Sequence, residues 1–108
     1  MRSVVMAVAV CLGMSSAAAA QGAAAKGEKL FVDQKCTLCH SVAGKGNAKG
    51  PLDGVGTKLT ADEMRAWITD AKGMTEKTKA TRKPAMKTYT LPKDDVDALV
   101  AYMQTLKK

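Results

Sequence analysis

The sequence predicts an all-α fold, a single small domain in which three main helices are joined by loops. Apolar residues recur at helical spacing in three segments, at about residues 24–35, 60–73 and 92–106. Alternating runs of β-branched and aromatic residues, which would predict strands, are nearly absent. The chain has 108 residues, a length that supports one hydrophobic core of limited size.

Residues 1–20 are expected to be a cleaved signal peptide. A basic start, an apolar stretch over Val4–Met14 and a run of small residues up to Ala20 follow one another as in a secretory leader. We expect cleavage after Ala20, with a cut after Ala25 as the alternative, so that residues 21–108 form the domain. The apolar run is shorter than the roughly 20 residues of a spanning helix, so no stable membrane insertion is expected. The predicted location is the periplasm.

The first helical segment leads directly into the pentapeptide Cys-Thr-Leu-Cys-His at residues 36–40. Two residues between the cysteines put both thiols on one side of a helical turn, where each can add to a vinyl group of a haem. His40 then reaches the iron as the proximal ligand. The pattern predicts one covalent haem c per chain, attached through Cys36 and Cys39.

Three other interpretations of this pentapeptide are less favoured. A structural zinc site needs four ligands, whereas the mature chain offers two cysteines and one histidine. A thioredoxin-like redox pair needs a strand and helix context that the sequence lacks. A plain disulfide between Cys36 and Cys39 leaves His40 unexplained.

The elements after the pentapeptide alternate between loop and helix. Residues 41–58 are rich in glycine and predict an ordered loop, with a flexible linker as the alternative. Thr60 and Glu63 form a capping box that starts the second helix, for which Gly73 is a plausible end. Residues 74–90 are predicted to be irregular, and the last helix to run from about residue 92 to 106.

A methionine is the expected sixth ligand of the iron, because the chain has no second histidine. Met64 and Met103 lie on apolar helical stripes, where methionine usually packs in the core. Met86 follows a proline in an irregular segment that can hold its side chain in place. We therefore predict Met86 as the ligand, with Met74 or an open position as the alternatives.

These features resemble the class I cytochrome c family over essentially the whole mature chain. The pentapeptide is similar to the haem attachment site of the family, and Met86 matches its distal methionine in order and spacing. The resemblance implies a small cytochrome c fold, with three main helices and loops wrapped around one covalently bound haem. It also implies an electron carrier and not an enzyme.

The resemblance assigns roles to residues outside the attachment site. Pro51 resembles a loop proline whose carbonyl accepts the hydrogen bond from the proximal histidine. Trp67 matches a helix tryptophan that in some relatives touches a haem propionate, although core packing is the other interpretation. Ala71 departs from similar sequences, which often have a helix-ending proline there. A contact between the first and last helices is implied for Gly27, Phe31, Leu99 and Tyr102.

The formal net charge of +7 suggests an acidic partner. Export argues against nucleic acid. We expect the basic residues near Met86 to steer the carrier to redox proteins with acidic docking surfaces, such as an oxidase, reductase or dehydrogenase. Solubility alone is the other explanation. These basic residues are Lys72, Lys77, Lys79, Arg82, Lys83 and Lys87.

The predicted function is that of a monomeric, periplasmic one-electron carrier with His/Met-ligated haem c, which shuttles electrons between respiratory or dehydrogenase partners. The alternative is a haem c subunit held permanently in a periplasmic oxidoreductase. A non-haem metal or disulfide module is a third possibility, which a visible spectrum would separate from the other two.

Overall fold

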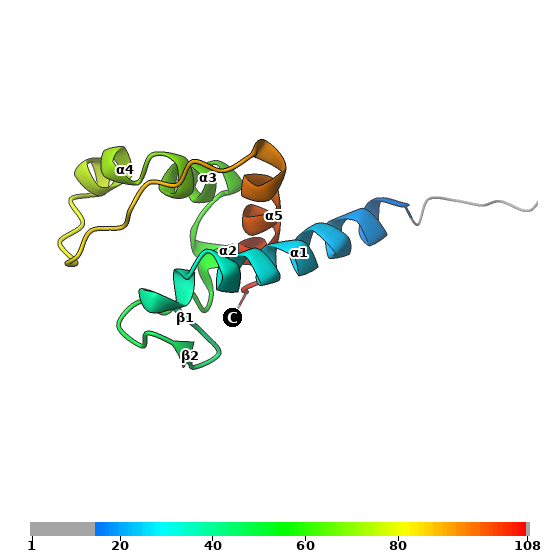
Figure 1. Ribbon diagram of the computed structural model, residues 1–108, viewed down its shortest axis with the longest axis horizontal. Helices are drawn as coiled ribbons and strands as arrows, with labels where there is room; N and C mark the ends of the chain where they lie inside the picture. Colours follow the sequence, from blue (N-terminus) through cyan, green and yellow to red (C-terminus); the bar gives the residue numbers. More distant parts are fainter. Residues whose placement is uncertain (1–14, 108) are drawn as a thin grey trace, which may run out of the picture.

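The computed structural model describes residues 15–107, and the side chains of residues 21–107 (Figure 1). The larger part of the predicted signal peptide, residues 1–14, lies outside the described residues. Within residues 15–107 no helix is both long enough and apolar enough to cross a membrane. The elements are α1 (Ser15–Asp33), the 3-10 helix η1 (Cys36–Leu38), β1 (Ser41–Val42), β2 (Lys45–Gly46), α2 (Val55–Lys58), α3 (Ala61–Thr69), α4 (Ala71–Thr78) and α5 (Lys93–Gln104). The mostly helical architecture confirms the predicted fold class.

Helix α1 crosses α5 at a glycine, as the sequence suggested. Gly27 is buried, and a Cβ atom there would lie 2.6 Å from the carbonyl carbon of Ala98 and 2.7 Å from Cβ of Tyr102. One turn later, the rings of Phe31 and Tyr102 meet with centroids 5.7 Å apart. Lys26 adds an ion pair with Asp95 at 3.0 Å. The absence of a side chain at residue 27 therefore sets how closely the first and last helices approach.

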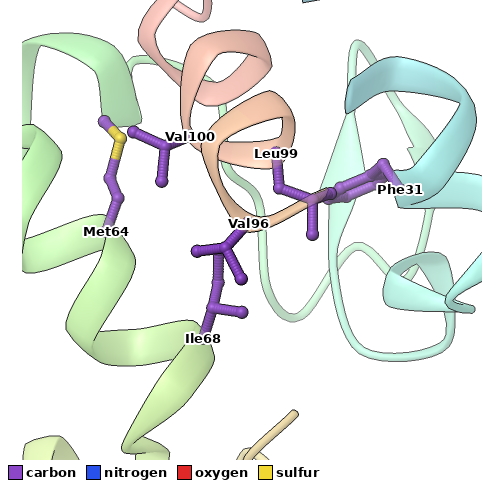
Figure 2. Close-up of a cluster of buried hydrophobic side chains, with 6 residues drawn as sticks. All are labelled: Phe31, Met64, Ile68, Val96, Leu99 and Val100. Atoms are coloured by element: carbon purple, nitrogen blue, oxygen red, sulfur yellow. The ribbon is translucent and has the colours of Figure 1, made fainter. Parts of the chain in front are cut away.

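Helix α5 also packs against α3 and so forms the centre of the core. Figure 2 shows α5 between the two other helices, with Leu99 toward the ring of Phe31 on α1. On its other side, α5 meets α3. All members of this cluster are at most 4% exposed, and they are Phe31, Met64, Ile68, Val96, Leu99 and Val100. Three helices thus bury their predicted apolar stripes against one another.

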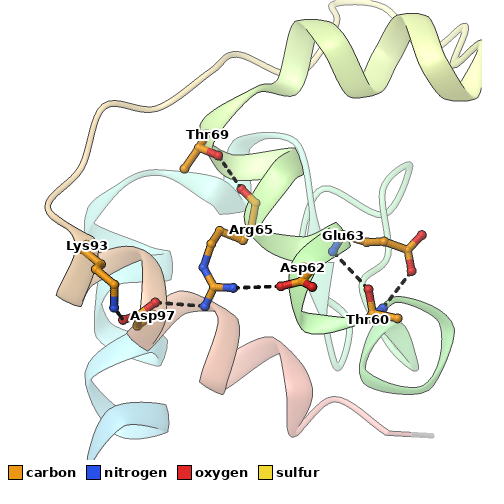
Figure 3. Close-up of polar contacts among 7 residues, drawn as sticks. All are labelled: Thr60, Asp62, Glu63, Arg65, Thr69, Lys93 and Asp97. Atoms are coloured by element: carbon orange, nitrogen blue, oxygen red, sulfur yellow. Dashed lines mark hydrogen bonds and ion pairs between the residues drawn. The ribbon is translucent and has the colours of Figure 1, made fainter.

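The capping box predicted at the start of α3 is present. The hydroxyl of Thr60 accepts a hydrogen bond from the backbone N–H of Glu63, and the Glu63 carboxylate accepts one from the N–H of Thr60 (Figure 3). Further along α3, Arg65 bonds to Asp97 of α5 at 3.0 Å. Lys93 binds the other oxygen of Asp97 at 2.8 Å. The contact between Arg65 and Asp97 joins α3 to α5 on the outer side of the core, while Lys93 holds the Asp97 carboxylate from within α5 (Figure 3).

The prediction that the second helix ends at Gly73 is wrong. Helix α3 ends at Thr69, and α4 begins two residues later. The cause is Asp70, whose carboxylate accepts a hydrogen bond from the N–H of Gly73 at 3.2 Å and so caps α4. The segment expected to be irregular from residue 74 is therefore helical up to Thr78.

Candidate functional site

The two cysteines lie on η1, immediately after a sharp change of chain direction. Lys35 adopts a left-handed conformation with φ 58°, which separates η1 from α1. The N–H groups of Cys39 and His40 both donate to the carbonyl of Cys36, at 3.2 and 2.9 Å. This tight turn brings both thiols to the wall of one cavity. Both thiols are free, and burial raises the pKa of Cys36.

His40 is held by a backbone carbonyl. Its Nδ1 lies 3.0 Å from the carbonyl oxygen of Gly50, and with Nδ1 as the donor Nε2 is left as the nitrogen with a free lone pair. Burial lowers the pKa of His40, and the positive charge of Arg82 lowers it further. The neutral imidazole that results is the form that binds metals.

The role implied for Pro51 requires a correction, because the acceptor for His40 is the carbonyl of the preceding residue, Gly50. A short parallel bridge explains the shift. The N–H of Ser41 donates to the Gly50 carbonyl at 3.0 Å, and the N–H of Leu52 donates to the Ser41 carbonyl at 2.8 Å. This bridge brings the Gly50 carbonyl next to residues 40 and 41, while Pro51 itself is exposed.

The segment after His40 folds back onto the attachment turn. Strands β1 and β2 pair in antiparallel fashion, and Gly46 has a positive φ of 110° at a place where a side chain would overlap the His40 carbonyl. Asn47 then donates its N–H to the carbonyls of Thr37 and His40, and its side-chain amide to the carbonyl of Leu38 at 3.0 Å. Sequence reasoning missed Asn47. The loop is therefore ordered, and its hydrogen bonds hold the pentapeptide in its turn.

The thiols and the imidazole open into a cavity of about 290 Å³, a volume close to the lower end of the range for small-molecule sites. Its walls are mainly apolar. They include Phe31, Leu52, Val55, Leu59, Met64, Ile68 and Leu99. A flat, largely apolar ring system with a metal at its centre fits this arrangement, because two thiols and a neutral imidazole share one wall of an apolar chamber.

The structure separates the methionines by position. Met86 lines the cavity from the irregular segment between α4 and α5. Met64 and Met103 also line it, from the core-forming helices α3 and α5. Met74 is buried on α4 and is not among the lining residues. Met86 is thus the lining methionine that does not lie on a helix of the core.

Two aromatic residues complete the walls. Trp67 lines the cavity from α3, is half-buried and lies outside the buried core cluster. Tyr89, which sequence reasoning missed, ties the Met86 segment to both sides of the site. Its N–H donates to the Ile68 carbonyl at 2.8 Å, and its hydroxyl reaches the carbonyl of Gln34 at 3.4 Å.

Comparison with known proteins agrees with this geometry. A family model described as Cytochrome c matches residues 24–107. Cytochrome c oxidase subunit 2 of Alkalihalophilus pseudofirmus is 28% identical over 91 residues, which cover 76% of this chain and 25% of that protein. The chain therefore spans about a quarter of the length of this relative. No solved structure matches the chain significantly. The chain belongs to the cytochrome c family, whose domain supports haem-based electron transfer.

Proposed function

We propose that this protein is a periplasmic one-electron carrier with a single haem c, held covalently by Cys36 and Cys39 and ligated by His40 and Met86. One observation carries the proposal: both thiols, the imidazole and the thioether line the same apolar cavity. It is supported by the match of the chain to the cytochrome c family. We propose no enzymatic activity.

Each part of the chain has a defined task in this proposal. The haem iron supplies the change of oxidation state when it is bound. The turn at η1 presents the thiols, and the Gly50 carbonyl fixes the tautomer and orientation of His40. The apolar walls exclude water, and a neutral thioether from Met86 favours the reduced state and raises the potential.

The attachment and the sixth ligand are tested by visible spectra of the exported protein. A covalent haem stays with the protein in acid acetone, and the oxidised protein shows a weak far-red sulfur-to-iron band. Met86→Leu removes this band, whereas Met74→Leu, a change of the same size outside the cavity, keeps it. Loss of the band in the Met74 variant alone would transfer the ligand assignment to Met74.

We further propose that the six basic residues of α4 and of the segment around Met86, from Lys72 to Lys87, guide the carrier to acidic redox partners. All six are exposed, and the segment that carries them supplies part of the cavity wall. Among the described residues none of the six forms an ion pair, whereas Lys26, Arg65 and Lys93 all pair with aspartates. Their positive charge therefore remains available for attraction over distance.

The docking proposal is tested by the salt dependence of electron transfer to an acidic redox partner. A Lys77, Lys79 and Lys87 to Gln triple variant is expected to transfer more slowly at low salt and to lose most of its salt dependence. A control triple variant at the exposed Lys29, Lys58 and Lys107 has the same net charge. Equal slowing by both triple variants would contradict a localised docking surface.

A second function, as an electron-transfer subunit held in a periplasmic oxidoreductase, is favoured by the similarity to an oxidase subunit. Native size-exclusion chromatography of periplasmic extract separates the two. A free carrier migrates as a monomer, whereas a subunit co-migrates with a larger chain. The intact mass of the same material tests export, because a signal peptide cleaved after Ala20 leaves Gln21 as the first residue.

A further inference from the structure

Asn47 contacts the attachment pentapeptide at three of its carbonyls. Its side-chain amide donates to the carbonyl of Leu38 at 3.0 Å. Its backbone N–H is shared between the carbonyls of Thr37 and His40, at 3.1 Å from each. A single half-buried loop residue is therefore tied to the turn that carries both thiols and the imidazole.

The other end of the amide shapes the turn that follows. The Oδ1 atom of Asn47 accepts a hydrogen bond from the N–H of Lys49 at 3.0 Å. The backbone carbonyl of Asn47 accepts one from the N–H of Gly50 at 3.1 Å. Because the Leu38 carbonyl can only accept and the Lys49 N–H can only donate, these two partners fix the orientation of the amide group. The conformation of residues 47–50 therefore depends on the side chain of Asn47.

This turn places the carbonyl that orients the imidazole. The Gly50 carbonyl oxygen lies 3.0 Å from Nδ1 of His40 and also accepts the N–H of Ser41 at 3.0 Å. A side chain at residue 50 would overlap the carbonyl of Cys39, so the turn lies directly against the pentapeptide. The contacts thus form a closed chain from the pentapeptide through Asn47 to Gly50 and back to His40.

We propose that Asn47 is a positioning residue, which holds the Gly50 carbonyl in place and thereby sets the strength of the hydrogen bond from His40. This inference rests on the proposed function, in which the other imidazole nitrogen binds the haem iron. A strong hydrogen bond at Nδ1 makes the imidazole a more basic ligand, which stabilises the oxidised state of the metal. Asn47 therefore lowers the reduction potential of the centre, although it is not among the residues that line the cavity.

The test compares the midpoint potentials of the wild-type holoprotein and three variants by redox titration. Asn47→Ala removes both hydrogen bonds of the side chain and is expected to raise the potential. Asn47→Ser should raise it less, because a hydroxyl can still accept from the N–H two residues further on and so keep the turn. Thr60→Ala is the control, since it also removes a side-chain bond to the backbone, at the start of α3, and should leave the potential unchanged.

Nuclear magnetic resonance of the same proteins, labelled at the histidine nitrogens, reports on the bond from His40 itself. Its Nδ1 proton is expected to exchange with solvent about 2–12 times faster in Asn47→Ala, the factor that corresponds to one hydrogen bond of typical net strength. A purely structural role for Asn47 would lower the stability of the domain, as Thr60→Ala does, without a shift of the potential.

The outcomes separate this inference from the proposed function. A wild-type protein without covalent haem overturns both. Covalent haem with the same potential in wild type and Asn47→Ala overturns the role of Asn47 alone, as does an equal rise in Asn47→Ala and Thr60→Ala. If Asn47→Ala is not recovered as folded protein, Asn47→Ser decides the question, because a raised potential supports the role and an unchanged one overturns it.

Discussion

Substitution of Gly27 by alanine is expected to separate the first and last helices. The new Cβ atom would lie 2.6 Å from the Ala98 carbonyl carbon, whereas ordinary contact begins at 3.4 Å. The helices must therefore part by about 0.8 Å or more, against backbone that cannot rotate away. Overpacking of this kind costs about 1–3 kcal/mol, and the higher helix propensity of alanine returns up to about 1 kcal/mol.

The net loss should fall near 2 kcal/mol, since the obstacle is a backbone group and not a flexible side chain. For a domain of this size, that corresponds to a fall of about 8–16 °C in Tm. Urea unfolding followed by far-UV circular dichroism and by Trp67 fluorescence measures the change. Gly22→Ala in the same helix is the control, because nothing lies within 4 Å of a Cβ atom there. An unfolding free energy of Gly27→Ala equal to that of wild type would refute the tight crossing.

Two further predictions concern the polar contacts that hold α3. Thr60→Ala should cost about 0.5–2 kcal/mol by removing the cap, as urea unfolding will show, and Thr60→Ser should restore it. Hydrogen bonds from Lys93 and Arg65 lower the pKa of Asp97, and those from Thr60 lower the pKa of Glu63. These carboxylates therefore add stability above their ordinary pKa values of 3.8 and 4.5, and this stability is lost as the pH falls through the lowered folded-state values. Asp97→Asn should be less stable than wild type at neutral pH and lose less stability on acidification. An unchanged acid dependence of its urea midpoint would contradict this.

Local sequence patterns were sufficient to predict the elements whose stabilising contacts lie between residues close together in the chain. The capping box at Thr60 and Glu63 forms as predicted, because its partners are three residues apart and both hydrogen bonds close within one turn. The apolar stripe of α5 is buried for a similar reason, since its 3.6-residue period fixes one face wherever the helix packs. The pentapeptide that predicts haem attachment also forms a single tight turn.

Two predictions were wrong because neighbouring residues offered more than one local signal. Glycine often ends a helix, so Gly73 was predicted to end the second helix, yet its N–H donates to the Asp70 carboxylate that caps the start of α4. The choice between the two carbonyls that flank the Gly50–Pro51 bond could not be made from composition. It was decided by the bridge between Ser41 and Pro51, which pairs segments ten residues apart.

The sequence alone determined the helical class of this protein and the turn that carries both cysteines and His40, and it predicted Met86 as a ligand from the proline two residues before it. Each of these rests on patterns among residues that are close together in the chain. Only the tertiary structure decided which residues share the cavity, because Arg82 and Tyr89 meet His40 at its walls from a segment that begins more than 40 residues further along the chain. Long-range contacts of this kind depend on how α1, α3 and α5 pack, and no short stretch of sequence specifies that packing.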